Sequence, residues 1–234
     1  MIYVMSDLHG CYDKYRIMLE RIRLQDEDTL YVLGDLVDRG NRNVDLILAV
    51  ASRKNIRPLM GNHDYMAALM LKIYGLKEGQ EKEEDSLQNK SESRDLFKSW
   101  LKDGGETTWT ELMKLPMAER LLILRLLQSL PVFTEFQLED RIYHLSHTVP
   151  EKAVLMDPQR LTPSEFLFGH PDYDKVYYPD KFLVTGHTPT GLIDPAFSGR
   201  IWQKNNHIAV DCGAVFGSPL GCICLDTGEE FYVE

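Results

Sequence analysis

The first third of the chain alternates short apolar runs with segments of helical spacing, and this alternation limits the fold more than any other feature. The runs are MIYVMSD at residues 1–7, TLYVLGD at 29–35 and IRPLMGNHD at 56–64. After the first run, Tyr15, Met18 and Ile22 fall on one helical face. Strands that alternate with helices of this length form βαβ units, so the sequence predicts an α/β fold with parallel strands.

Two segments interrupt this pattern. Residues 79–95 hold a single large apolar residue, Leu87, so the region around 76–95 is predicted to be a solvated and mobile insertion. The region around 150–179 is rich in proline and is predicted to run irregularly over the surface. The other segments of the C-terminal half have the composition of strands. We expect one domain over residues 1–234 that carries both excursions.

Charge and cysteine usage limit the partners and the compartment. The net charge of −10 argues against nucleic acid as a partner, although metal ions can still let an acidic chain bind phosphate. No basic leader and no apolar run of membrane-spanning length is present, so we expect no membrane partner. The four cysteines lack a zinc-ribbon spacing, and Cys222 and Cys224 are expected on one buried strand face. These features predict a cytoplasmic protein without disulfides.

Polar side chains follow five of the predicted strands at the point where each strand ends. They are Asp7 and His9 in SDLHG, Asp35 and Asp38 in GDLVDRG, Asn62 and His63 in GNHD, His147 in LSH, and His187 in VTGH. Ligands of wound α/β sheets bind outside the carboxyl ends of the strands. The five strand ends are therefore expected to direct carboxylates, imidazoles and one amide into a shared space.

The donor types in this set predict metal ions. A mixture of oxygen and imidazole ligands suits manganese, iron or zinc better than magnesium or calcium. Six such ligands are too many for one ion that must keep an open position, but they suit two ions that share a carboxylate. We therefore expect two divalent ions, with Mn²⁺ preferred and iron or zinc as alternatives.

The motifs D-x-H, G-D-x-x-D-R-G, G-N-H-D and G-H-T, in this order, resemble those of the calcineurin-like metallophosphoesterases. Within them, the chain resembles the bacterial and phage serine/threonine phosphoprotein phosphatases. The resemblance implies the metallophosphoesterase fold, an α+β sandwich of two mixed β-sheets with flanking helices. It also implies a first metal ion held by Asp7, His9 and Asp35, and a second held by Asp35, Asn62, His147 and His187.

The same resemblance implies roles in hydrolysis by direct attack of a metal-bridging hydroxide on phosphorus. His63 would protonate the leaving group, Asp38 would hold the other nitrogen of that imidazole, and Arg39 would bind phosphate together with Asn62. The family's second phosphate-binding arginine is replaced at FLFGH by His170. Either His170 binds phosphate in its place, or a basic residue of the proline-rich excursion does so, such as Arg160 or Lys175. His144 is expected to be an ordinary strand residue.

Three functions remain open from the sequence. The preferred one is a protein serine/threonine phosphatase, because WLKDGGETT at residues 100–108 is similar to the W-x-x-x-G-G stretch of bacterial protein phosphatases. The alternative is a symmetrical diadenosine tetraphosphate hydrolase, a relative with the same metal motifs. The third is a non-catalytic phosphate-binding module. The expected partner is thus a phosphorylated protein or a small phosphoester, and no sequence feature indicates an oligomeric state.

Overall fold

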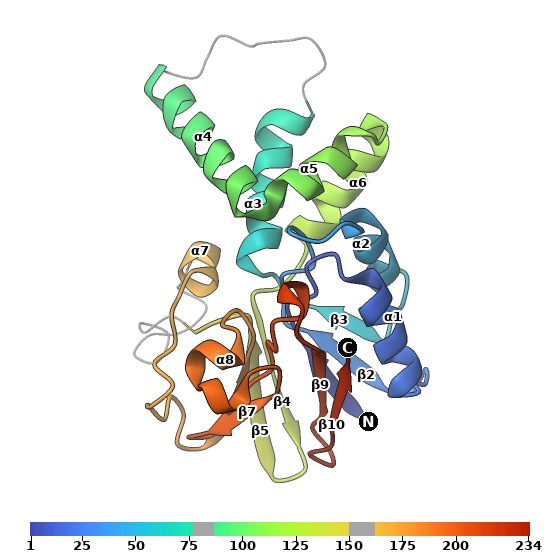
Figure 1. Ribbon diagram of the computed structural model, residues 1–234, viewed down its shortest axis with the longest axis vertical. Coiled ribbons are helices and arrows are strands. Elements are labelled where there is room, and N and C mark those ends of the chain that lie inside the picture. Colours follow the sequence, from blue (N-terminus) through green and yellow to red (C-terminus); the bar gives the residue numbers. More distant parts are fainter. Residues whose placement is uncertain (77–86, 150–161) are drawn as a thin grey trace.

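The structure is a computed structural model that describes residues 1–76, 87–149 and 162–234 (Figure 1). In chain order its helices and strands are β1 (Ile2–Met5), α1 (Tyr12–Arg21), β2 (Thr29–Val32), α2 (Asn43–Ala51), β3 (Ile56–Pro58), α3 (Asn62–Met70), α4 (Leu87–Trp100), α5 (Glu106–Met113), α6 (Met117–Gln128), β4 (Phe133–Leu138), β5 (Arg141–Ser146), α7 (Pro163–Leu167), β6 (Lys181–Thr185), α8 (Thr190–Ile193), β7 (Trp202–Lys204), β8 (His207–Ala209), β9 (Leu220–Cys224) and β10 (Glu230–Val233).

The strands form two mixed sheets, as the family resemblance implies. The first has the order β10-β9-β1-β2-β3, and the second has the order β4-β5-β6-β8-β7. In the first sheet β1, β2 and β3 run parallel, whereas β9 and β10 join as an antiparallel pair. In the second sheet β5, β6 and β8 run parallel between two antiparallel edge strands. The parallel strands of both sheets therefore bring their carboxyl ends to one side of the molecule.

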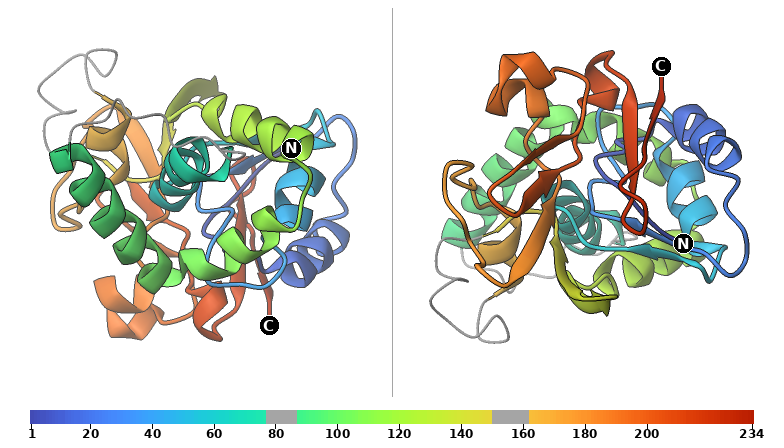
Figure 2. Two further views of the ribbon diagram at one scale, coloured as in Figure 1. Left: turned by 90° about the horizontal axis from the view of Figure 1, so that it is seen from above. Right: turned by 90° about the horizontal axis from the view of Figure 1, so that it is seen from below.

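The first sheet is buried on both faces, which explains its unbroken apolar runs. Tyr3 and Met5 pack into the core beneath the helices, whereas Val4 between them packs into the core that the two sheets share. Cys222 and Cys224 lie together in the helix-side core, so their predicted common face is confirmed. Figure 2 shows the helices over one face of this sheet and the second sheet over the other.

Helices α3 to α6 form an arm beyond the carboxyl ends of the strands (Figure 1). The predicted insertion is helical from Leu87, where α4 begins, and its residues from Ser91 to Asp95 are mostly exposed. The rest of that prediction, at residues 77–86, lies outside the described residues. The α4 and α5 helices join through a π-helical turn in which Asp103 and Gly104 leave helical geometry.

The proline-rich excursion is described from Thr162 onward, and residues 150–161 lie outside the described part. It contains the short helix α7, and the chain between α7 and β6 forms no further helix or strand. None of the described helices combines the length and the hydropathy that crossing a bilayer requires. That residues 1–234 form one domain stays a proposal, which the core shared by the two sheets supports.

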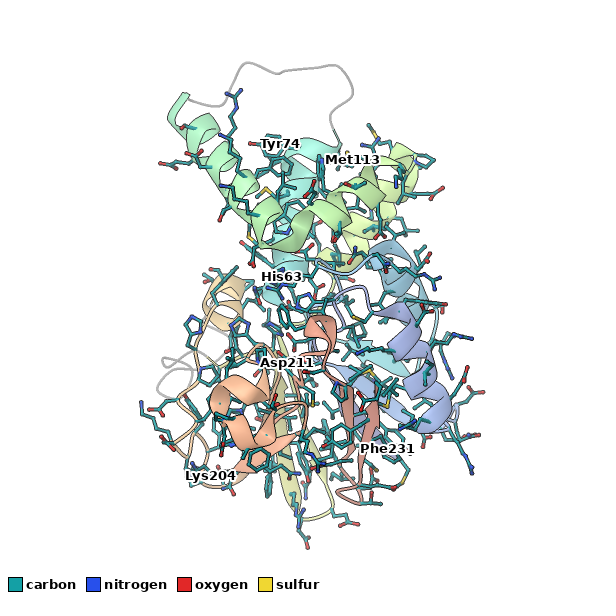
Figure 3. All side chains as sticks on the ribbon, in the orientation of Figure 1. His63, Tyr74, Met113, Lys204, Asp211 and Phe231 are labelled. Carbon is teal, nitrogen blue, oxygen red and sulfur yellow. The ribbon has the colours of Figure 1, made fainter. Side chains whose placement is uncertain are left out.

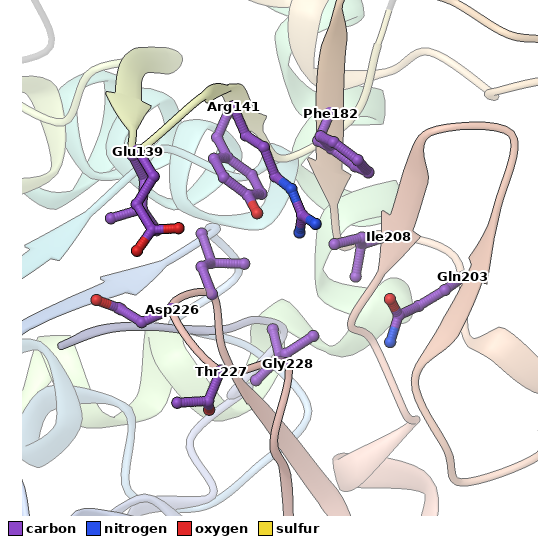
Figure 4. Close-up of a pocket in the computed structure, with 12 residues that line it drawn as sticks. Glu139, Arg141, Phe182, Gln203, Ile208, Asp226, Thr227 and Gly228 are labelled. Atoms are coloured by element: carbon purple, nitrogen blue, oxygen red, sulfur yellow. The ribbon is translucent and has the colours of Figure 1, made fainter.

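The β4–β5 and β9–β10 turns lie at the end of the sandwich opposite the helical arm (Figure 1). A pocket of about 260 Å³ lies between these turns (Figure 4). Its lining combines apolar side chains, among them Phe182 and Ile208, with the charged Glu139, Arg141 and Asp226. Figures 1 and 3 place this end of the molecule far from His63, which lies where the helical arm meets the strands.

Candidate metal centre

The backbone turns sharply where the strands end, and these turns direct the predicted site residues. Ten non-glycine residues of the described part have positive φ, and six of them are predicted site residues: Asp7, His9, Asp35, Asp38, Arg39 and His187. Such left-handed positions cost about 1–3 kcal/mol each, and they concentrate at functional sites. The surrounding packing must therefore hold this edge of the sheets in place.

Two glycines of the motifs allow the turns to approach each other. A Cβ atom on Gly61 would lie 2.1 Å from Oδ1 of Asp35, and one on Gly186 would lie 2.3 Å from Oδ2 of Asp7. No side chain fits at these separations. The glycines of GNHD and VTGH thus let two strand ends pack directly against carboxylates of the candidate site.

The described residues contain two groups of three side chains that could hold a metal ion, and both include Asp35. One is His9, Asp35 and His63, and the other is Asp35, His147 and His187, with ligand atoms within 4.8 Å of one another in each group. The amide oxygen of Asn62 adjoins the second group, 2.8 Å from Nε2 of His147 and 3.1 Å from Nδ1 of His187. Asp35 is therefore placed between the two groups, as a bridging ligand requires.

Asp7 lies beside these groups. It is buried, and its Oδ2 atom accepts hydrogen bonds from the Ser6 hydroxyl and, at 2.9 Å, from the backbone N–H of His187. Neither group of three contains Asp7, whereas the first contains His63, which was predicted as an acid and not as a ligand. The assignment of Asp7 as a ligand stays a prediction.

The tautomers of two imidazoles leave their lone pairs facing the site. Nδ1 of His9 donates to the carbonyl of Val37 at 2.7 Å, and Nδ1 of His147 donates to that of Leu33 at 2.7 Å. A carbonyl can only accept, so Nδ1 carries the proton and Nε2 keeps its lone pair. Such carbonyl contacts are the usual way of orienting a metal-binding histidine.

Burial favours the neutral form of the imidazoles of His9, His147 and His187, because it lowers the pKa of each. It lowers the pKa of His9 to about 3, with help from the nearby His63, and it lowers the pKa of His187 to about 3 with help from His147. Burial, followed by the carboxylates of Asp7 and Asp64, raises the pKa of Asp35 well above its usual value. Neutral imidazoles are the form that binds metal, and a bound cation would favour the ionised carboxylate.

The donor set therefore fits divalent metal ions. In the second group, Nε2 of His147 faces an amide oxygen at 2.8 Å and the Asp35 carboxylate at 3.5 Å, and each of these atoms is a hydrogen-bond acceptor. Acceptors at such separations repel one another unless a cation lies among them. The chemistry of this cluster, together with its burial, is what a metal site of mixed oxygen and nitrogen ligands requires.

Arg39 and the His63–Asp38 pair lie next to the first group. The Arg39 guanidinium donates to Nε2 of His9 and, at 2.8 Å, to Nε2 of His63. Nδ1 of His63 lies 2.7 Å from Oδ2 of Asp38, which is fully buried. One imidazole thus contacts a carboxylate on one side and a cation on the other.

Sequence reasoning missed two residues that hold Asp38. The indole Nε1 of Trp100 donates to Oδ2 of Asp38 at 2.7 Å, and the hydroxyl of Thr108 donates to Oδ1 at 2.6 Å. The backbone N–H of Asp38 also lies 2.9 Å from that hydroxyl. WLKDGGETT was singled out by resemblance, and a buried Trp in such a stretch was the available signal, since a buried indole N–H needs an acceptor.

The arm also places a carboxylate beside Arg39. Oδ1 of Asp103 lies 3.3 Å from Nη2 of Arg39, and Oδ2 lies 3.7 Å from Nε2 of His63. The next residue, Gly104, accepts a hydrogen bond from the backbone N–H of Arg39 at 2.9 Å. The Asp103 side chain is 64% exposed, so it lies at the mouth of the site.

The structure brings one of the remaining predicted residues to the site. The His170 ring is exposed, and its centroid lies 5.8 Å from that of His187. Lys175 contacts Asp172 at 3.2 Å, and Arg160 lies outside the described residues. His144 is buried in β5 and stacks on Phe133, which agrees with the expected strand role. The phosphate-binding role of His170 stays a prediction.

Comparison with known proteins adds a family and a fold. The calcineurin-like phosphoesterase family matches residues 1–191. A solved structure of a protein provisionally assigned as a diadenosine tetraphosphatase superposes with a TM-score of 0.68 at 15% identity, covering 99% of this chain and 92% of that one. A protein serine/threonine phosphatase from Saccharomyces cerevisiae superposes with a TM-score of 0.57 at 16% identity, covering 100% of this chain and 80% of that one. At such identities these similarities establish the shared fold.

Curated relatives match shorter stretches. A symmetrical bis(5′-nucleosyl)-tetraphosphatase of Aggregatibacter actinomycetemcomitans is 44% identical over 64 residues, which is 26% of this chain and 23% of the relative. That of Actinobacillus pleuropneumoniae serotype 3 is 30% identical over 103 residues, 43% of this chain and 37% of the relative. The chain thus spans well under half the length of these relatives. The family match, by contrast, covers most of the sequence, and the chain belongs to the calcineurin-like phosphoesterase family.

Proposed function

We propose that this chain is a metal-dependent phosphoester hydrolase that binds two divalent ions on either side of Asp35. The observation that carries the proposal is the cluster of buried acceptors in which Asp35 belongs to both groups of candidate ligands. His9, Asp7 and Asp35 would hold one ion, and Asn62, His147, His187 and Asp35 would hold the other. The ions would supply positive charge for the phosphoryl oxygens and a nucleophile at neutral pH. Mn²⁺ is our preferred metal.

The neighbouring side chains have roles that their contacts support. Arg39 would bind two phosphoryl oxygens with its planar fork, joined by the amide of Asn62. His63 would donate a proton from Nε2 to the leaving oxygen once Arg39, which donates to that nitrogen in this structure, binds phosphate instead, and its Nδ1–H would stay bonded to Asp38. The Asp38 carboxylate would stabilise the charged imidazole, since opposite charges in contact favour ionisation.

For the substrate, we propose a dinucleoside tetraphosphate, which was the alternative in the sequence interpretation. Its support is that the curated relatives are symmetrical tetraphosphatases. Phosphoserine or phosphothreonine in proteins, the preferred sequence interpretation, is the second candidate. It is favoured by the W-x-x-x-G-G stretch, whose Trp100 contacts Asp38. The free thiols of Cys11, Cys212, Cys222 and Cys224 are compatible with the cytoplasmic location that we propose.

Rates on three substrates test this proposal. The purified protein is stripped with a chelator, checked by elemental analysis, and reloaded with Mn²⁺. We expect activity to return with metal and kcat/KM to be highest on diadenosine tetraphosphate, compared with a phosphoserine peptide and p-nitrophenyl phosphate. A preference for the peptide would favour the second candidate. If the protein binds phosphate tightly but hydrolyses none of the three esters, the non-catalytic phosphate-binding module would be the remaining candidate function.

Loss of either hydrogen bond to Asp38 is expected to weaken proton donation. Hydrogen bonds to charged groups contribute about 1.5–3 kcal/mol, so Thr108→Val and Trp100→Phe should each lower kcat roughly tenfold or more on an ester with a poor leaving group. The loss should be smaller on p-nitrophenyl phosphate, whose leaving group barely needs a proton. Thr110→Val, at an exposed position of the same helix, is the control. Equal losses on both esters would assign Trp100 and Thr108 to folding alone.

Removal of the Asp103 charge is expected to improve phosphate binding. Asp103→Asn takes away an anion 3.3 Å from Nη2 of Arg39, which would otherwise compete with the substrate. Because the Asp103 carboxylate is exposed, the gain should be only about threefold in KM, and larger for a tetraphosphate than for a monoester. Asp95→Asn on α4, which removes an equally exposed carboxylate beside Lys98, should leave KM unchanged. A higher KM in Asp103→Asn would show that Asp103 orients Arg39 instead.

A further inference from the structure

Two phenylalanines remain exposed beside the proposed phosphate-binding residues. Phe216 is 65% exposed and Phe168 is 45% exposed. A single exposed apolar side chain on a protein surface needs no explanation. These two differ, because one contacts Arg39 and the other lines a cavity with His63.

The backbone turn that carries Phe216 is held by hydrogen bonds, although its ring is open to solvent. It ends a short 3₁₀ turn (Ala214–Phe216) between two glycines with left-handed backbone, Gly213 at φ +82° and Gly217 at φ +91°. The Lys14 ammonium on α1 fixes this turn by donating to the carbonyls of Ala214 at 3.2 Å and Ser218 at 2.7 Å. The guanidinium carbon of Arg39 lies 5.4 Å from the centre of the Phe216 ring.

Phe168 belongs to a different part of the site. It follows α7 and lines a cavity of about 150 Å³ together with His63, Met66, Leu96 and Trp100. Its ring packs edge-on against Tyr65 of α3, with centroids 6.3 Å apart. Figure 1 shows α7 and the red turn before β9 as separate elements below the arm, at the level where α3 begins. The cavity, which Asn62, Ser99 and Asp103 also line, thus places a largely apolar surface next to the proposed proton donor.

We propose that Phe216 and the Phe168 cavity are stacking sites for the two bases of a dinucleoside polyphosphate. The inference rests on the proposed function, which places phosphate on Arg39 between the two aromatic surfaces. Aromatic faces bind nucleobases of any identity by stacking, and a cationic group beside them holds the phosphates. A monoester with one leaving group would occupy only the surface next to His63, so a second aromatic surface beside Arg39 favours a ligand with two planar ends.

Substitution of each phenylalanine tests the stacking sites. We expect Phe216→Ala and Phe168→Ala each to lower kcat/KM on diadenosine tetraphosphate about tenfold relative to kcat/KM on glycerol 2-phosphate, which has no ring. Phe216→Trp should restore the ratio, since tryptophan offers a larger stacking face. Leu122→Ala, which truncates a 51% exposed side chain on α6 away from the site, should leave the ratio unchanged. Calorimetric titration with adenosine diphosphate, which carries one base, should show two binding events in the unchanged protein, and each alanine variant should weaken one of them by a similar factor.

The outcomes separate this inference from the proposed function. If the Mn²⁺-loaded protein hydrolyses no ester, the proposed function fails, and the titration with adenosine diphosphate still decides the stacking sites. Unchanged nucleotide affinity and an unchanged ratio of kcat/KM in both alanine variants would overturn the inference. It would also be overturned if the variants lost activity on a phosphotyrosine peptide but kept it on diadenosine tetraphosphate, because the surfaces would then bind a peptide.

Discussion

Asp35→Asn is expected to remove both metal ions and to lower kcat/KM roughly 10³-fold or more, because one carboxylate serves both groups of candidate ligands. The amide keeps the shape of the side chain but loses its negative charge, on which the binding of two cations depends. Elemental analysis after dialysis against Mn²⁺ measures the metal content, and initial rates on p-nitrophenyl phosphate measure the activity.

A buried aspartate outside the candidate site provides the control for Asp35→Asn. Asp28 is buried, and it accepts hydrogen bonds from the terminal amine of Met1 at 2.8 Å and from the N–H of Gln25 at 2.9 Å. Asp28→Asn should lower stability without changing the metal content. Retention of two ions per chain in Asp35→Asn would contradict the bridging role.

His63→Asn is expected to lower kcat by about 10²–10⁴-fold on esters with poor leaving groups, the usual contribution of a general acid. The reason is geometric: Nδ1 of His63 is bonded to Asp38, so Nε2 is the nitrogen that can deliver a proton to the site. The loss should shrink on p-nitrophenyl phosphate. Comparing kcat on the two esters in the same variant removes errors in protein concentration.

His63 also belongs to the first group of candidate ligands, so the metal content of the His63→Asn protein must be measured in parallel. An acid role predicts that His63→Asn keeps both ions and loses rate only where protonation is needed. Loss of one ion, with equal losses on both esters, would make His63 a ligand. His144→Gln, a change at a buried histidine outside the site, should affect neither the metal content nor the difference between the two esters.

Much of the candidate site could be predicted from local sequence, and the reason is topological. Asp7, Asp35 and Asn62 each follow a parallel strand of one sheet, and parallel strands present their carboxyl ends at the same edge. The strand pattern therefore predicts that these residues meet, without any knowledge of side-chain packing. The extension of the set to His147 and His187 relied on the same rule in the second sheet.

Predictions based on composition were weaker. The insertion was judged from its few apolar residues, yet it is helical from Leu87, because α4 is stabilised at its C-terminal end by Phe97 and Trp100 packing against the arm. The sequence of α6 is apolar nearly all round, which is typical of a buried helix, but of its residues only Ile123, Leu124 and Leu127 are buried. Leu126 packs partly against the core, whereas Leu122 is exposed, and local composition does not reveal where an arm ends.

The sequence by itself determined the α/β pattern with parallel strands and the gathering of carboxylates and imidazoles at one edge, since both follow from the period of strands and the spacing of βα units, while the two-sheet arrangement was implied by the family resemblance. Only the tertiary structure decided what surrounds that edge. Trp100 and Thr108 reach Asp38 across 62 and 70 residues, and Asp103 reaches Arg39 across 64. These contacts depend on how the break at Gly104 directs the arm over the strand ends, and no local pattern encodes such a direction.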